Sequence, residues 1–304
     1  MPMTRYGQTR NALSDHNLAP KKRFGQNFLV NSKTAINIVK AAKVQADDTI
    51  VEVGVGLGAL TQPLAEAAQN VVGLEIDSGI VRFHEEENDL PENVTIIHLD
   101  VLKADFDDLF ATCGGPLKIV ANLPYSISNP FIFKLIENRH LVESAVIMLQ
   151  KEVGERLMAI PSTKEYGIPS VLLQSCATIS KLMTLKPAEF HPRPKIDSVI
   201  IKMVFHADKP VSENGDEIHF PIFQKIIRQS FNQRRKTISN TLANCCFFSP
   251  DKSLDKQENK RLTLEAIEDA GISPSVRPEV LSVDQFIKLA VSFERIIKRE
   301  KGSW

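Results

Sequence analysis

The sequence contains little cysteine and no long hydrophobic run. None of its four cysteines belongs to a Cys-x-x-Cys pair, which argues against a disulfide framework and against a zinc site. No apolar stretch approaches the roughly 20 residues that cross a bilayer, and residues 1–20 lack the apolar segment of a signal peptide. We therefore expect a cytoplasmic protein that binds no metal and no membrane. Residues 1–20 are expected to form a flexible tail, for which a mitochondrial presequence is the alternative.

An excess of charge is lacking as well, because 37 basic and 37 acidic residues cancel. A zero net charge would argue against a nucleic-acid partner, but the charges are segregated along the chain. Residues 1–40 contain a single acidic residue, and residues 218–250 contain none. Such segregation can create one basic face although the totals cancel; charges solvated on unrelated faces are the alternative. The candidate nucleic-acid contacts are Lys21, Lys22, Arg23, Lys225, Arg228, Arg234, Arg235 and Lys236.

From Thr49 onward, short β-branched runs alternate with helical patterns, which is typical of a parallel α/β sheet. The near-continuous apolar character of the runs suits a sheet covered by helices on both faces. The last run is expected to close the sheet. The predicted strands are 49–53, 71–75, 94–98, 117–121, 145–149 and 198–205.

After Phe205 a polar segment resembles a linker, and only helical periodicity follows. We therefore predict an α/β domain at residues 21–207 and a small helical domain at residues 208–304. In the helical domain, Lys225, Arg228 and Arg235 are expected to share a broad face of one helix. The predicted core residues of this domain are Ile226, Ile227, Ile238, Phe286, Leu289, Ala290, Phe293 and Ile297.

A glycine loop, Glu52-Val-Gly54-Val-Gly56-Leu-Gly58-Ala59, follows the first strand and opens a helix. Glycines allow a tight turn and a close approach of ligand and backbone. The loop also fits the dinucleotide fingerprint G-x-G-x-x-A, so a dehydrogenase is an alternative, as is a loop that merely caps the helix. The carboxylate of Glu52, however, would repel a pyrophosphate, whereas it suits the ammonium and sulfonium of S-adenosylmethionine.

Two further acids support S-adenosylmethionine as the ligand. Glu75 ends the second strand and can accept hydrogen bonds from both ribose hydroxyls. Asp100 follows the third strand and can accept one from the adenine amino group. Acids at successive strand ends around a glycine loop therefore predict an S-adenosylmethionine site.

The stretch Asn122-Leu-Pro-Tyr125 follows the fourth strand, at the carboxyl edge where α/β proteins bind ligands. An exocyclic adenine amine is a poor nucleophile because its lone pair is delocalised into the ring. The side-chain carbonyl of Asn122 and the backbone carbonyl of Pro124 can hold its N–H groups and expose the lone pair. Tyr125 offers a flat surface for the extruded base. A proline turn with Tyr125 in the core is the alternative.

Taken together, these motifs resemble those of amino-methylating S-adenosylmethionine enzymes. Further stretches resemble the ribosomal RNA adenine dimethyltransferases, and residues 233–240 and 277–286 resemble the small-subunit (16S) branch specifically. The resemblance covers about Lys21 to Ile297. It is carried by residues 23–29, 150–156, 166–167, 170–171, 190–198, 233–240 and 277–286.

The resemblance implies a Rossmann-like class I S-adenosylmethionine methyltransferase sheet followed by a small helical domain for RNA and ribosome recognition. It also implies dimethylation of N6 in two adjacent adenines of the 3′-terminal hairpin of 16S ribosomal RNA during assembly of the 30S-type subunit, by a protein we expect to be monomeric. The phenyl ring of Phe190 would stack on the second face of the base. The positions that match cofactor contacts are Asn27, Leu29, Gly54, Glu75, Asp100 and Asn122, to which our interpretation of the glycine loop adds Glu52 and Gly56.

Val55 and Asn129 stand where this family more often has proline and threonine; neither change removes a required group. A large-subunit dimethyltransferase of the macrolide-resistance type would share the catalytic motifs, although the basic cluster and residues 277–286 favour the small-subunit branch. A non-catalytic nucleic-acid-binding relative is a second alternative, but the acids of the cofactor site would then lack a purpose.

Overall fold

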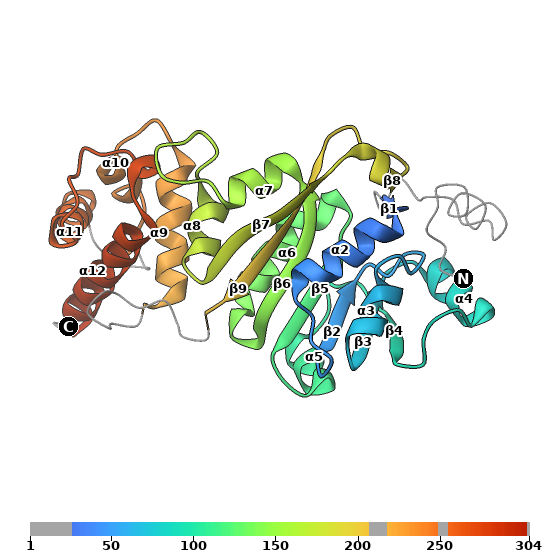
Figure 1. Ribbon diagram of the computed structural model, residues 1–304. Helices are drawn as coiled ribbons and strands as arrows, with labels where there is room; N and C mark the ends of the chain where they lie inside the picture. Colours follow the sequence, from blue (N-terminus) through green and yellow to red (C-terminus); the bar gives the residue numbers. More distant parts are fainter. Residues whose placement is uncertain (1–25, 207–217, 249–254, 303–304) are drawn as a thin grey trace. The chain divides into compact units, whose positions relative to one another are not determined.

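The computed structural model describes residues 26–206, 218–248 and 255–302, and the chain divides into two compact units (Figure 1). The sheet unit comprises Met1–Gly154 with Thr178–Ala207, and the helical unit comprises Glu155–Ala177 with Asp208–Trp304. The expected flexible tail, residues 1–20, lies outside the described residues. No helix in the described part of the chain is long and apolar enough to span a membrane.

A seven-stranded sheet in the order β4-β3-β2-β5-β6-β9-β7 forms the centre of the sheet unit. Strands β4, β3, β2, β5 and β6 are parallel to one another, and β9 pairs antiparallel with β6. The strand bounds are β2 Thr49–Val53, β3 Asn70–Glu75, β4 Val94–His98, β5 Leu117–Asn122, β6 Val142–Gln150, β7 Ala177–Leu185 and β9 Ser198–Phe205. All six predicted strands are thus confirmed, together with the class of fold.

One strand of the seven-stranded sheet was not predicted. β7 lies at the edge of the sheet, so Ser198–Phe205 does not close it but lies between β6 and β7. Only the two ends of β7, Ala177 and Leu185, are fully buried. An edge strand that exposes most of its side chains lacks the continuous apolar run that marks a central strand, which is why the sequence pattern did not reveal it.

Helices α2 and α3 cover one face of the sheet. Ile38 and Leu64, one from each helix, belong to the same buried cluster as Ile50, Val120 and Ile200 of the strands. The helices of the sheet unit are α2 Ser32–Ala42, α3 Thr61–Ala67, α4 Ser78–Glu87, α5 Phe106–Cys113 and α6 Ser128–Glu137, and α7 Lys151–Leu157 follows β6.

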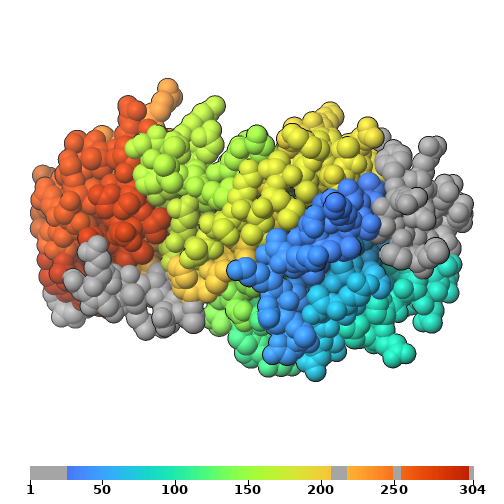
Figure 2. Space-filling model, in the orientation of Figure 1, coloured from blue at the N-terminus to red at the C-terminus, as the bar shows by residue number. Residues whose placement is uncertain are grey.

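A separate two-stranded ladder joins the beginning of the described chain to a segment about 160 residues later. β1 (Phe28–Leu29) pairs antiparallel with β8 (Phe190–His191). In Figures 1 and 2 the blue N-terminal segment accordingly lies against the yellow segment around residue 190. This ladder positions Asn27 and its neighbours at the pocket described below.

The helical unit contains α8 Ile168–Gln174, α9 Phe220–Asn232, α10 Ile238–Leu242, α11 Lys256–Asp269 and α12 Val283–Gly302. All the core residues that we predicted for it are buried. The ring of Phe231 lies between those of Tyr166 and Phe286, with centroid distances of 6.0 and 5.8 Å.

The unit begins earlier in the chain than we expected. Glu155–Ala177 belongs to it rather than to the α/β domain of residues 21–207. Tyr166 is fully buried there, and its hydroxyl donates a hydrogen bond to the Leu281 carbonyl at 2.9 Å. The predicted boundary between residues 207 and 208 agrees with these units, and the difference is this inserted segment. The sequence did not reveal it because the segment lies between two strands of the sheet, while its contacts with Phe231, Arg234 and Leu281 are made more than 60 residues away.

Candidate functional site

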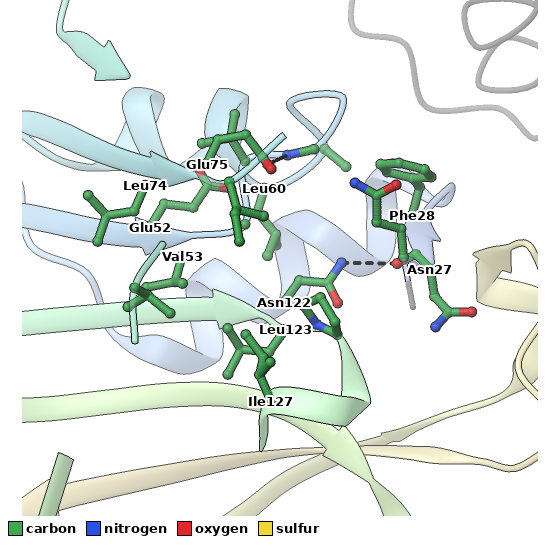
Figure 3. Close-up of a pocket in the computed structure, with 18 of the residues that line it drawn as sticks. Asn27, Phe28, Glu52, Val53, Leu60, Leu74, Glu75, Asn122, Leu123 and Ile127 are labelled. Carbon is green, nitrogen blue, oxygen red and sulfur yellow. Dashed lines mark hydrogen bonds between the residues drawn. The ribbon is translucent and has the colours of Figure 1, made fainter. Parts of the chain in front are cut away.

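A pocket opens at the carboxyl ends of β2, β3 and β5 (Figure 3). Parallel α/β sheets bind ligands at this edge. The pocket brings together every residue for which we predicted a cofactor contact, and Pro124 as well. These residues are Asn27, Leu29, Glu52, Gly54, Gly56, Glu75, Asp100 and Asn122.

The glycine loop lines the pocket, and its backbone conformation would be strained for residues other than glycine. Gly54 has a φ of +82°, and a Cβ there would lie 2.9 Å from the Asn122 carbonyl oxygen. Gly56 has a φ of +56°, and its N–H donates to Glu75 Oε2 at 3.0 Å. Val55, which stands where the family more often has proline, is buried and packs against Gly73 of β3. The valine therefore still anchors the loop on the sheet.

Glu52 is a fully buried acid, and among the described residues neither of its carboxylate oxygens has a hydrogen-bond partner. Burial raises its pKa from the ordinary value of 4.5 to about 8; the Thr61 hydroxyl opposes this shift and Glu75 adds to it. The Thr61 hydroxyl is itself buried without a partner in hydrogen-bonding geometry. Unpaired buried polar groups cost free energy, and Glu52 lines a pocket that a cationic group could fill.

Glu75 and Asp100 project from neighbouring strand ends. Glu75 Oε1 accepts the Asp77 N–H at 2.8 Å while Oε2 accepts that of Gly56, so both oxygens are oriented. Burial raises the pKa of Glu75, and the backbone N–H donors oppose that shift. Asp100 Oδ1 accepts the Leu102 N–H at 3.0 Å. Each carboxylate keeps acceptor capacity for a ligand.

Asn122 ends β5, and its side-chain amide donates to the Asn27 carbonyl at 3.3 Å (Figure 3). This bond uses the amide nitrogen and leaves the side-chain oxygen as an acceptor. The Pro124 carbonyl accepts the Ile127 N–H at 3.1 Å, and its second lone pair can still accept another donor. Two acceptors are thus available where the sequence predicted an adenine amine.

Tyr125 begins the 3-10 helix Tyr125–Ile127 directly after Pro124 and is half-buried. Its hydroxyl lies 2.6 Å from the Ser198 hydroxyl, a contact that the sequence did not reveal. Burial raises the pKa of Tyr125, and the bond to Ser198 opposes that shift. Tyr125 is not among the residues that line the pocket.

Phe190 is buried in the sheet unit. It is 0% exposed and belongs to the buried cluster that contains Leu29, Val39 and Met148. The stacking of its ring on the base, which the resemblance implied, stays a prediction.

The predicted nucleic-acid residues are only partly brought together. Lys21, Lys22 and Arg23 lie outside the described residues. α9 ends at Asn232, so Arg235 does not continue the face of Lys225 and Arg228, and the expected shared helical face is wrong.

Two of the basic side chains also make contacts within the helical unit. Lys225 donates to the Cys246 carbonyl at 2.8 Å and lies over the ring of Phe247. Arg234 donates to the Lys164 and Tyr166 carbonyls at 2.9 and 2.8 Å. Lys225, Arg228, Arg235 and Lys236 are nevertheless exposed to solvent, whereas Arg234 is half-buried.

The fold is that of the class I S-adenosylmethionine-dependent methyltransferases, with a mostly parallel seven-stranded sheet and a pocket at its carboxyl edge. The chain belongs to the ribosomal RNA adenine dimethylase family, whose sequence model matches residues 17–270.

Relatives and solved structures agree with this membership. The chain is 56% identical to the ribosomal RNA small subunit methyltransferase A of Desulfotalea psychrophila, over 98% of this chain and 99% of the relative. It is 38% identical to the protein of the same name from Lachnoclostridium phytofermentans, over 93% and 94%. A dimethyladenosine transferase from Plasmodium falciparum superposes with a TM-score of 0.71 at 27% identity, over 88% and 98%. The 23S rRNA methyltransferase ErmE, at 22% identity, shares the fold, with a TM-score of 0.62 over 88% and 100%.

Proposed function

We propose that this chain dimethylates N6 of two adjacent adenines in the 3′-terminal hairpin of 16S ribosomal RNA, with S-adenosylmethionine as the methyl donor, during assembly of the small subunit. The relatives named as small-subunit methyltransferases support the substrate. The observation that carries the chemistry is the unpaired Glu52 in a pocket lined by Glu75 and Asp100. The monomeric state and the cytoplasmic location stay predictions.

The pocket residues fit S-adenosylmethionine group by group. The buried carboxylate of Glu52 needs a cationic partner, which the ammonium of the methionine portion offers. Glu75 would accept from the ribose hydroxyls, and Asp100 from the adenine amino group. When bound, S-adenosylmethionine supplies a methyl group on a positively charged sulfur. Asn27, Leu29, Gly54 and Gly56 would form the walls of its site.

The chain's own part in the reaction is to hold the adenine amine. The side-chain oxygen of Asn122 and the carbonyl of Pro124 would accept its two N–H groups and turn its lone pair toward the methyl donor. Tyr125, with its hydroxyl on Ser198, would present its ring to the extruded base. Alignment of the reacting atoms then supplies most of the acceleration without a strong general base.

The test is the transfer of radiolabelled methyl groups to unmethylated small subunits, compared with large-subunit RNA. We expect two adjacent dimethyladenines near the 3′ end of the small-subunit RNA. Labelling of large-subunit RNA instead would favour the macrolide-resistance alternative. Tight binding of NAD in calorimetry, without binding of S-adenosylmethionine, would overturn the proposal.

We further propose that the basic residues of the helical unit contact phosphates of the ribosomal RNA. Phosphate contacts position a protein without reading sequence, and each one contributes to the salt dependence of binding.

Changing Arg235 and Lys236 together to glutamate should weaken subunit binding, with a shallower salt slope and unchanged affinity for S-adenosylmethionine. Lys256 and Lys260, exposed on α11, give the matched control. Equal effects of the two pairs would argue against a specific role of the first pair. If binding and methylation stay unchanged, Lys21, Lys22 and Arg23 become the candidates.

A further inference from the structure

His84 is a buried histidine on α4 that touches the glycine loop from outside the pocket. Its side chain is 4% exposed, and it does not line the pocket. Its Nε2 lies 2.8 Å from the Gly56 carbonyl oxygen, and its Nδ1 lies 2.7 Å from Asp89 Oδ1. The ring therefore connects the backbone of the loop to a carboxylate.

The chemistry of these two contacts determines the protonation of the ring. A carbonyl oxygen and a carboxylate oxygen only accept hydrogen bonds, so both ring nitrogens must donate. A neutral imidazole carries a single N–H, whereas an imidazolium carries two. With Asp89 ionised, both contacts are satisfied together when His84 is an imidazolium.

The bond from His84 completes the fixation of Gly56. The N–H of Gly56 donates to Glu75 Oε2 at 3.0 Å, and its carbonyl accepts from His84. Gly56 adopts a φ of +56°, and a Cβ there would lie 3.1 Å from the ring of Phe28. Both polar groups of the residue at the centre of the loop are thus held, one from β3 and one from α4.

Other charged groups surround this arrangement. Asp89 follows α4, and its side chain is 37% exposed. Glu75 comes from β3, and His98 comes from β4, where its Nε2 lies 3.2 Å from the Ile76 carbonyl. On α4 itself, Glu85, Glu86 and Glu87 are exposed to solvent. The carboxylate in direct contact with the ring is Asp89.

We propose that His84 is a positioning residue for the methyl-donor site: as an imidazolium between Asp89 and the Gly56 carbonyl, it holds the glycine loop in its binding shape. The inference rests on the proposed binding of S-adenosylmethionine at this pocket. His84 acts through Gly56 and touches neither the ligand nor the adenine. Nothing in the sequence motif of the loop indicates this support, because His84 lies 28 residues after Gly56.

The first measurement is the protonation of the ring. In protein labelled with ¹⁵N-histidine, long-range ¹H–¹⁵N spectra near neutral pH should show both nitrogens of His84 protonated. Asp89→Asn removes the negative charge and offers an amide N–H that can donate to Nδ1, so its spectrum should shift toward the neutral tautomer with the proton on Nε2. A neutral ring in the unmodified protein would overturn the proposal.

The second measurement is the affinity for S-adenosylmethionine by calorimetry. His84→Leu keeps much of the ring's volume and removes both donors, so its Kd should rise about tenfold or more, since hydrogen bonds from charged groups are the stronger ones. Asp89→Asn should raise Kd about threefold to tenfold. His140→Leu, at an exposed position on the 3-10 helix Arg139–Leu141, is the control and should leave Kd unchanged.

The outcomes separate this inference from the proposed function. If the unmodified protein fails to bind S-adenosylmethionine, the proposed function fails first. If it binds and both the His84 and the Asp89 variants bind equally well, the positioning role is wrong while the function stands. Circular dichroism identifies a His84 variant that has lost its fold, and the spectrum of Asp89→Asn then still decides the question.

Discussion

Replacing Glu52 by glutamine should stabilise the ligand-free protein and at the same time weaken the binding of S-adenosylmethionine. Burial raises the pKa of Glu52 from 4.5 to about 8. Between pH 4.5 and about pH 8, the folded protein therefore holds a proton on Glu52 that the unfolded chain releases. The stability that this proton contributes is fully present below pH 4.5 and is lost as the pH rises to about 8.

The size of the effect follows from the difference between the two pKa values. One pKa unit corresponds to about 1.4 kcal/mol, so a shift of roughly 3.5 units amounts to about 5 kcal/mol, and about 3 kcal/mol of this has been lost near neutral pH. Glutamine does not titrate. The difference in unfolding free energy between Glu52→Gln and the unmodified protein should therefore grow in favour of the variant by up to about 1.4 kcal/mol per pH unit between pH 5 and pH 8. Glu75 titrates in both proteins and largely cancels.

Urea denaturation at a series of pH values measures this difference, and calorimetry at the same pH values measures ligand affinity. The unmodified protein should bind S-adenosylmethionine up to about tenfold more tightly per pH unit as the pH approaches 8, because the ammonium pairs with the ionised carboxylate. Glu52→Gln should bind weakly at every pH. A stability difference that does not vary with pH would refute the burial argument. Unchanged affinity in Glu52→Gln would refute the pairing with the ammonium.

Substitutions at three further residues, Glu75, Asn122 and Tyr125, test the rest of the site. Glu75→Ala should raise the Kd for S-adenosylmethionine at least about tenfold, as calorimetry would show, whereas Glu92→Ala in an exposed loop should leave it unchanged. Asn122→Ala should nearly abolish methyl transfer while subunit binding survives, and a loss of both would instead indicate a folding defect. Tyr125→Ala should cost about 1–3 kcal/mol in transition-state stabilisation if the ring is a stacking platform. Tyr125→Phe loses only the bond to Ser198 and should retain activity within about tenfold; a Tyr125→Phe variant as inactive as Asn122→Ala would show that the hydroxyl matters.

The pocket could be predicted from the sequence because a parallel sheet imposes its own geometry. The carboxyl ends of neighbouring parallel strands meet at one edge. Acids and amides at the ends of predicted strands, such as Glu75, Asp100 and Asn122, therefore had to lie close together once the strands were recognised. Glycines in a strand-to-helix loop add a close backbone approach, which Gly54 makes at the Asn122 carbonyl.

The contacts that join distant segments could not be predicted in this way. Periodicity identifies the core residues of a helix but not where the chain leaves it, so the end of α9 at Asn232 separated Arg235 from Lys225. Arg234 donates to carbonyls 68 and 70 residues earlier, and no local pattern carries that information. A basic residue on an acid-free segment can therefore support the fold of its own unit instead of, or in addition to, a surface for RNA.

Residues 28–34 and the segment around Phe190 are far apart in the sequence but are bonded to each other in the structure. Leu29 pairs with Phe190 in the ladder of β1 and β8, and the Val30 N–H donates to the Glu189 carbonyl at 2.9 Å. The Thr34 hydroxyl donates to the carboxylate of Glu189 at 2.8 Å. These bonds hold strand β1, which directly follows Asn27, and the Asn27 carbonyl in turn accepts the side-chain amide of Asn122. The burial of Phe190 beside Leu29 thus helps to fix the strand against which Asn122 is oriented, in addition to the base contact that we predict for its ring.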